Sequence, residues 1–375
     1  MSRATDSLSK KIILPVTVGV MVGMVIGWHQ TRSAEPSRSE VQAQIAEAAS
    51  APSEHAQRGF DLWTLVDGAS RQADELKASE SDACQTGFLR DPHLSEVDIN
   101  RLSALHAQVV IEQHAARLRM APDALGRLTG AMLADDYATL IQVGQTTSDP
   151  LVYGLALRAC PSQRVPGCTA LTPQRWAELD ESNASAWWMV AASSQNQADA
   201  FRALTSASTA THALPLRNQW LKRAAQTDEA TREAMFPVLM KTIHLDSLEL
   251  SPSTAGFTRA CGSTPSTDPE RSAACLGFAL DAVRLEPSAI GKLIATRLAE
   301  RWGAKAEQLP HTVAELKTKV EAIGNWRSSM VTGAEGRQFC EGIRQMVEFD
   351  ADSADDGDLA AFERLQARRK TASAR

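Results

Sequence analysis

Residues 94–120 read LSEVDINRLSALHAQVVIEQHAARLRM, and this stretch decides the fold class. Its apolar residues return every three or four positions, which is typical of a helix, and do not alternate as in a half-buried strand. Leu102, Leu105, Val109 and Ala116 are expected to share the buried face. The longest patterned segment of the chain therefore predicts a helix.

The segments that follow repeat this helical pattern up to the end of the chain. Six of them begin with a proline, aspartate, serine, threonine or asparagine of the kind that starts a helix, at 121–123, 148–150, 172–173, 180–183, 228–229 and 251–252. Alternating runs of Val, Ile, Tyr and Phe are missing, and the chain has only 2 tyrosines. The sequence therefore predicts an all-α fold.

Ahead of these helices lies an uncharged run at 12–28, IILPVTVGVMVGMVIGW, which is just long enough to cross a bilayer core. Slightly more basic residues precede it (Arg3, Lys10 and Lys11) than follow it (Arg32 and Arg38). The run is expected to be an uncleaved signal anchor with its N-terminus in the cytoplasm. A cleavable signal peptide, cut after Val25-Ile26-Gly27, is the alternative. Both predict a chain whose bulk is periplasmic or otherwise extracytoplasmic, and the first makes it a single-pass membrane protein.

Shifts in composition divide the chain into five parts. They are a short tail and transmembrane anchor at 1–29, a linker at 30–59, an N-terminal helical region at 60–147, a helical-repeat-like region at 148–300, and C-terminal helices with an acidic turn at 301–375. The linker is rich in Ala, Ser, Glu, Gln and Pro, as expected of a spacer between a membrane and a domain.

Six cysteines, an even number, favour disulfides in an exported protein. Cys160 and Cys168 flank one Pro/Gly-containing loop, and Cys261 and Cys275 flank another, so each pair is expected to form a short-range bridge. Cys84 and Cys340 remain, and by elimination they could join the two ends of the domain. None of the spacings is that of a zinc or haem site.

Prolines recur at near-regular intervals, at 215, 252 and 287, and a period in the mid-thirties is typical of two-helix repeats. The phrase LDESNASAWW at 179–188 resembles the helix junction of the tetratricopeptide family, with Glu181 where proline is usual. In that frame Trp187 is the opening aromatic residue, Ala191, Ala203 and Ala210 are the small residues between helices, and Pro215 closes the unit. The resemblance covers about Asn183 to Pro215.

The resemblance implies an array of antiparallel helix pairs that presents a surface to a protein or peptide. Ser194 and Ala207 replace large residues of the family pattern, and Arg259 replaces the opening aromatic residue of a later unit. An irregular α-solenoid without true repeats therefore remains the alternative.

No short catalytic signature occurs in the sequence, and no catalytic residue is assigned. Three groups of residues are candidate sites. His106, Glu112 and His114 lie at spacings that point in different directions on one helix, so surface histidines are expected. Asp135 and Asp136 would point about 100° apart on a helix, which favours a solvated face. Cys340 with a distant histidine could be a nucleophile pair, but a disulfide is favoured.

The segment 352–363, DSADDGDLAAFE, resembles an EF-hand calcium loop. Asp352, Asp356, Asp358 and Glu363 are its candidate ligands, and Ala354 stands where another oxygen ligand is needed. Weak calcium binding is therefore one hypothesis. An acidic turn whose aspartates cap the last helix is the favoured interpretation. The short basic tail at 368–370 is expected to be solvated.

Net charge is −6, which does not suggest a nucleic-acid partner. The tryptophans at 176, 187, 188 and 220 are expected to pack between helices rather than to form a ligand cage. The sequence is best explained as a membrane-anchored scaffold that binds a protein or peptide and carries no cofactor. The alternatives are an extracytoplasmic hydrolase, with His106 or His244 beside carboxylates, and the calcium-binding module.

Overall fold

In the computed structural model, the described residues are 96–161, 165–226, 235–239, 241, 252–332 and 337–373. All of them belong to the compact unit Ser79–Arg375. Within these ranges the chain is helical, and the one β-type contact is an isolated bridge between Asn183 and His212. The all-α prediction is confirmed. The expected anchor at 12–28 and the linker at 30–59 lie outside the described residues, and no described helix is long and apolar enough to cross a membrane.

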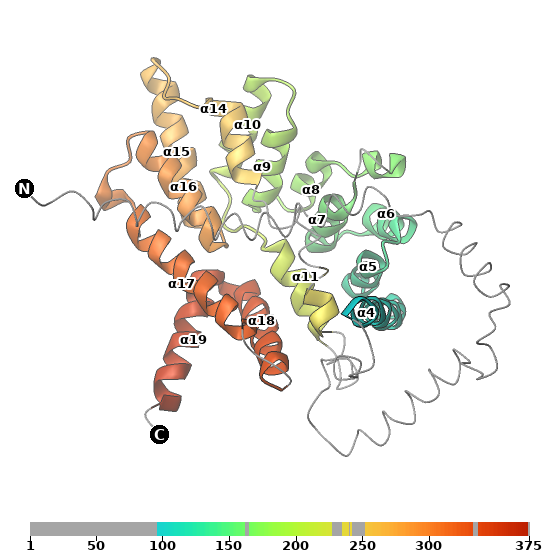
Figure 1. Cartoon of the computed structure of the whole chain (residues 1–375). Helices are drawn as coiled ribbons and strands as arrows, with labels where there is room; N and C mark the ends of the chain where they lie inside the picture. The colour runs from blue at the N-terminus through green and yellow to red at the C-terminus, as the bar shows by residue number, and fades with distance from the viewer. Residues whose placement is uncertain are drawn as a thin grey trace, which may run out of the picture. The chain divides into compact units, whose positions relative to one another are not determined.

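Figure 1 shows the order of the helices, and their bounds follow. They are α4 (Glu96–Arg119), α5 (Ala124–Leu133), α6 (Tyr137–Thr146), α7 (Pro150–Ala159), α8 (Pro173–Leu179), α9 (Ala184–Ser193), α10 (Gln197–Ala207), α11 (Leu216–Ala225), α14 (Pro252–Cys261), α15 (Pro269–Leu285), α16 (Ala289–Arg301), α17 (Val313–Val331), α18 (Arg337–Asp356) and α19 (Asp358–Ser373), with 3-10 turns η2 (Pro166–Ala170) and η4 (Ala306–Gln308).

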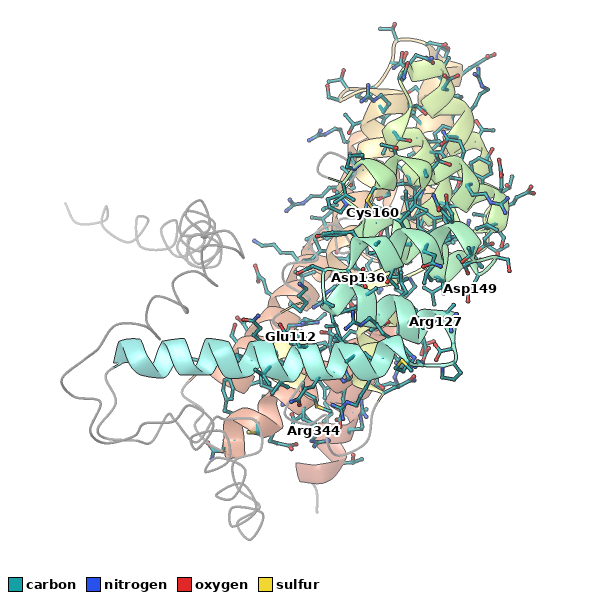
Figure 2. All side chains as sticks on the ribbon, turned by 90° about the vertical axis from the view of Figure 1, so that its right-hand side faces the viewer. Glu112, Arg127, Asp136, Asp149, Cys160 and Arg344 are labelled. Atoms are coloured by element: carbon teal, nitrogen blue, oxygen red, sulfur yellow. A yellow bond between two sulfur atoms is a disulfide. The ribbon has the colours of Figure 1, made fainter. Side chains whose placement is uncertain are left out.

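Side chains at the expected positions start several of these helices. Asp149 accepts hydrogen bonds from the first amides of α7, and Pro150 follows at the first helical position. Thr172 and Asn183 cap α8 and α9 in the same way. Asp136 and Asp149 are labelled at the starts of α6 and α7 in Figure 2. The local start signals therefore predict the starts of α7, α8 and α9 correctly, whereas the cap at Asp136 is not among them.

The buried apolar side chains form two clusters. The larger runs from α4 through α16 and on to α18, with Trp176, Trp188 and Trp220 among its members. The smaller belongs mainly to α17, α18 and α19 and contains Trp326 and Phe349, whose ring centroids are 5.0 Å apart. The tryptophans at 176, 188 and 220 pack between helices, as expected.

Helix α11 lies between α5 and α18 and so joins distant parts of the chain (Figure 1). Gln219 Nε2 donates to the carbonyl oxygen of Ala354 at 2.8 Å, and Lys222 Nζ lies 2.8 Å from the carboxylate of Asp355. On its other side, Arg223 pairs with the α5 capping residue Asp123. Hydrogen bonds and ion pairs thus fix α11 against both neighbours.

The expected buried face of α4 is wrong. Val109 and Ala116 are exposed, whereas Val110, Ala115 and Leu118 are buried, and the side chains of Leu102 and Leu105 lie outside the described residues. Three consecutive apolar residues at 109–111 make the pattern compatible with more than one face. The contact with α5 therefore determines which face is buried.

The segment with the tetratricopeptide resemblance forms the two contacting helices α9 and α10. Ala191, Ala203 and Ala210 are buried, as their expected small-residue positions require. Helix α14 also packs on α9, and a side chain at Gly256 would lie 2.8 Å from the backbone oxygen of Trp188. The helix pair is present, while a repeat architecture stays a prediction.

Two disulfides are present as predicted. Cys160 pairs with Cys168 across the loop between α7 and η2, and Cys261 pairs with Cys275 across the connection from α14 to α15. Their sequence separations are 8 and 14 residues. None of the described cysteines is free, which is consistent with an oxidising location. Cys84 lies outside the described residues, so its bond to Cys340 stays a prediction.

Two glycines in the middle of neighbouring helices should respond oppositely to the same substitution. A methyl group at Gly342 in α18 would overlap the backbone oxygen of Met330 in α17, whereas one at Gly324 in α17 meets open space. We expect Gly342→Ala to lower the free energy of unfolding by about 1–3 kcal/mol through overpacking. Gly324→Ala should raise it by up to about 1 kcal/mol, because alanine is the better helix former. Urea unfolding followed by circular dichroism measures both, and a stable Gly342→Ala protein would contradict this packing.

Candidate binding site

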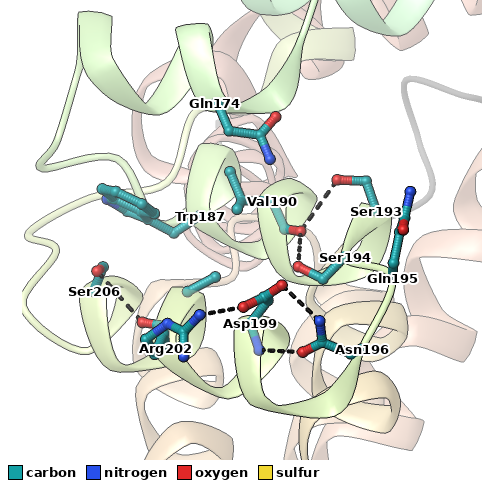
Figure 3. Close-up of a pocket in the computed structure, with 11 residues that line it drawn as sticks. Gln174, Trp187, Val190, Ser193, Ser194, Gln195, Asn196, Asp199, Arg202 and Ser206 are labelled. Carbon is teal, nitrogen blue, oxygen red and sulfur yellow. Dashed lines mark hydrogen bonds and ion pairs between the residues drawn. The ribbon is translucent and has the colours of Figure 1, made fainter.

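A hollow of about 460 Å³ opens on the surface formed by α8, α9 and α10. Figure 3 shows it between Gln174 of α8, Trp187 of α9 and Arg202 of α10. The remaining lining comes from the end of α9, the connection to α10 and one face of α10: Val190, Ser193, Ser194, Gln195, Asn196, Asp199, Ala203 and Ser206. The hollow therefore belongs to the helix pair that resembles the tetratricopeptide family.

Trp187 gives the hollow its aromatic surface. Its indole Nε1 donates a hydrogen bond to the backbone oxygen of Glu181 at 2.9 Å, so the polar end of the ring is held by the chain itself. The side chain is half-buried, unlike the fully buried Trp188 beside it in sequence. Such a ring offers a large apolar surface at a small cost in conformational entropy. Trp187 packs against the main apolar cluster, as expected, and the rest of its ring faces the hollow.

The polar groups on the α10 side of the hollow are held by one another. Asn196 caps α10 by accepting from the amide of Asp199 at 2.9 Å, and its own Nδ2 donates to the Asp199 carboxylate at 2.8 Å. Arg202 pairs with the same carboxylate. The two charged side chains of the hollow thus compensate each other, and the hollow carries no net charge.

Two amide side chains remain available. Gln174 and Gln195 are exposed at the hollow and make no hydrogen bond to any described residue. Each offers both an N–H donor and a carbonyl acceptor, which are the groups that a polypeptide backbone presents in return. An apolar ring beside unpaired amides suits a neutral ligand with its own amide groups.

A buried ionic cluster lies elsewhere, where α11 meets the C-terminal helices. Asp350 of α18 is fully buried and lies 3.4 Å from Arg217 of α11, and it also pairs with Arg327 of α17. Burial raises the pKa of the Asp358 carboxyl above its ordinary value, although a hydrogen bond from the amide of Ala289 opposes this shift. These contacts join helices, which indicates a structural role.

The four candidate calcium ligands are not arranged as an EF-hand loop. Helix α18 continues to Asp356, and α19 begins at Asp358 after Gly357, whose φ of 82° makes the sharp turn between them. Asp352 and Asp356 pair with Arg368 and Arg364 of α19, respectively, and Glu363 pairs with Lys319 of α17. Among the described residues, no group of three or more His, Cys, Asp or Glu side chains is placed to hold a metal ion.

The other candidate groups also do not form one site among the described residues. His114 is buried rather than exposed, and its Nε2 lies 2.9 Å from the backbone oxygen of Ala224 in α11. The expectation of a surface histidine is therefore wrong, because a histidine can satisfy a buried carbonyl between two helices. The side chain of His106 and all of His244 lie outside the described residues.

The expected helix at Asp135 and Asp136 is in fact a turn between α5 and α6. Asp135 has a φ of 53° and pairs with Lys241 at 2.7 Å, while Asp136 caps α6 and lies 3.5 Å from Arg119. Each carboxylate therefore has its own cation, and the two do not form an acid–base pair.

Comparison with known proteins finds no relative of this chain. No family model matches the chain, and neither a curated protein nor a solved structure matches it.

Proposed function

We propose that this chain is a membrane-anchored, extracytoplasmic scaffold that holds an extended polypeptide segment of a partner protein in the α8–α10 hollow. The observation that carries the proposal is the composition of that hollow. It combines the fixed indole of Trp187, the unpaired amides of Gln174 and Gln195, and a compensated Asp199–Arg202 pair.

An extended segment matches each of these groups. Its backbone can exchange hydrogen bonds with the glutamine amides, and one of its apolar side chains can pack on the indole. A strongly charged ligand is disfavoured, because it would have to compete with the pairing of Asp199 and Arg202. The partner segment is therefore expected to be neutral, with an apolar residue at its centre.

The location in the proposal is supported by two features. The apolar run at 12–28 has the length of a transmembrane helix, and the disulfides Cys160–Cys168 and Cys261–Cys275 are consistent with an oxidising compartment. In this proposal the anchor is uncleaved and the helices form an array of pairs. No observation on the described residues favours the hydrolase or calcium-binding alternatives, so neither belongs to the proposal.

Photocrosslinking in living cells tests the hollow directly. A photoreactive benzoylphenylalanine at Gln195 of the full chain should give a discrete adduct with a partner protein. Benzoylphenylalanine in place of Thr205, which is exposed on α10 but does not line the hollow, should not give that adduct. Mass spectrometry of the adduct should locate the crosslink in a neutral segment of the partner.

Trp187→Ala tests how much the indole ring contributes to binding of the partner. Truncating an aromatic anchor of an interface costs more than about 1 kcal/mol, so the yield of the Gln195 adduct at limiting partner should fall by at least about fivefold. Equal adducts at positions 195 and 205, or an adduct unchanged by Trp187→Ala, would argue against the hollow as the binding site.

A further inference from the structure

Helix α16 exposes apolar side chains that nothing in the described part of the chain covers. Ile290 is 59% exposed and Ile294 is 39% exposed, one helical turn apart. Among the described residues, the other strongly exposed large apolar side chains are Val109 of α4 and Met120, which follows α4. The two isoleucines lie on the same face of α16 and so form one small, continuous apolar surface.

Two arginines extend the same face. Positions 290, 294, 297 and 301 fall within an arc of about 60° when each residue turns the helix by about 100°. Arg297 and Arg301 are both exposed, and neither forms an ion pair with a described residue. We call Ile290, Ile294, Arg297 and Arg301 the α16 stripe. It is apolar at its N-terminal end and cationic at its C-terminal end.

The packing of α16 explains why this face points outward. Its buried side chains, Ala289, Ala295, Thr296 and Ala299, belong to the opposite side of the helix, which contacts α15 and α17. Lys292 also lies on that opposite side, where its Nζ donates to the backbone oxygen of Val283 at 3.2 Å, so it is not part of the stripe. The exposed face is therefore not needed for the internal packing of α16.

We propose that the α16 stripe contacts an anionic lipid surface and so orients the domain on the membrane. The two guanidinium groups match lipid phosphates in charge, and the isoleucines can enter the boundary between headgroups and acyl chains. A bilayer accepts aliphatic side chains without a complementary pocket, whereas a protein partner is usually held by aromatic residues in one. The stripe has no aromatic residue, which favours the lipid.

The proposed membrane anchor strengthens the binding of the small α16 stripe to the lipid surface. Two arginines and two isoleucines bind a membrane only weakly by themselves, but a tether keeps the local lipid concentration high. This inference rests on the membrane location in the proposed function and not on the hollow. Crosslinking at Gln195 and the lipid experiment below therefore test separate proposals, and either one can fail without the other.

Fluorescence of a label on the stripe tests the contact. None of the described cysteines is free, so Ile294→Cys can carry nitrobenzoxadiazole in the full chain. The labelled chain is reconstituted into vesicles of phosphatidylcholine alone or with 30% phosphatidylglycerol as probe, with the domain outside. We expect a blue-shifted emission only in the anionic vesicles, and quenching there by nitroxide lipids. The same label at Thr205→Cys should show neither effect.

Charge variants of the labelled chain test whether the two arginines are attracted to the lipid phosphates. Arg297→Gln with Arg301→Gln should abolish the blue shift, whereas Arg297→Lys with Arg301→Lys should keep most of it, since lipid phosphates attract either cation. An equal shift in neutral vesicles, or no shift in either, would overturn the proposal. A shift that appears only with added acidic protein, without nitroxide quenching, would assign the stripe to a protein partner and would also overturn it.

Discussion

Asp350→Ala should lower the free energy of unfolding by about 3–5 kcal/mol, because it removes one partner from a buried ion pair. The carboxylate of Asp350 is fully buried between Arg217 of α11 and Arg327 of α17. Without it, two cations would face each other at the junction of the helices. The guanidinium of Arg327 also lies 5.2 Å from the centroid of the Phe349 ring, so its displacement would disturb the C-terminal core.

A chemically identical change in the same helix provides the control. Asp356 of α18 pairs with Arg364, but both side chains are substantially exposed. Exposed pairs contribute about 0–1 kcal/mol, so Asp356→Ala should be nearly neutral. Urea unfolding of both variants measures the difference. If the two substitutions cost the same, the cluster at Asp350 would not be the connection between α11 and the C-terminal helices that the distances indicate.

Trp176→Ala should be equally severe, with an expected loss of about 3–5 kcal/mol. The side chain of Trp176 is 1% exposed, and its ring lies against α7 at Gly154. A Cβ at position 154 would come within 2.5 Å of ring atom Cε2, so the indole occupies the space that glycine leaves. Removal of the indole therefore creates a cavity between α7 and α8 that the rigid backbone cannot close.

Two further variants separate this cavity from general damage. Trp187→Ala removes a half-buried indole and should cost about 1 kcal/mol, the typical value for a point substitution. Gly154→Ala should be destabilising alone but much less so together with Trp176→Ala, with a coupling energy of about 1 kcal/mol or more. Strictly additive costs would mean that the glycine and the indole do not share the same space.

Much of the fold follows from local chemistry. The caps at Asp149, Thr172 and Asn183 form within a few residues of sequence, and so do the loops that the two disulfides close. Such features can be predicted from the sequence because each depends on near neighbours in the chain. The buried face of α4 does not follow from its own sequence, since contacts with the next helix, α5, and with the distant α11 select it.

The candidate site was predictable only in part. Trp187 stood out as the opening aromatic residue of a helix pair, and the structure places it at the hollow. The sequence carries no signal that singles out Gln195 and Asn196, because their place in the hollow depends on Gln174 of α8, which lies about twenty residues earlier in the chain. The acidic segment at 352–363 shows the opposite case: its spacing resembles a metal loop, but arginines of α19 pair with two of its aspartates.

The short reach of the two described disulfides has a consequence for how the protein matures. Each bond joins cysteines only 8 or 14 residues apart, so in the exported protein that we propose it can close once its second cysteine reaches an oxidising compartment. In that case neither bond has to wait for α18, which follows all four cysteines in the chain. Closing a short loop costs less chain entropy than closing a long one, which favours these neighbouring pairs over distant ones.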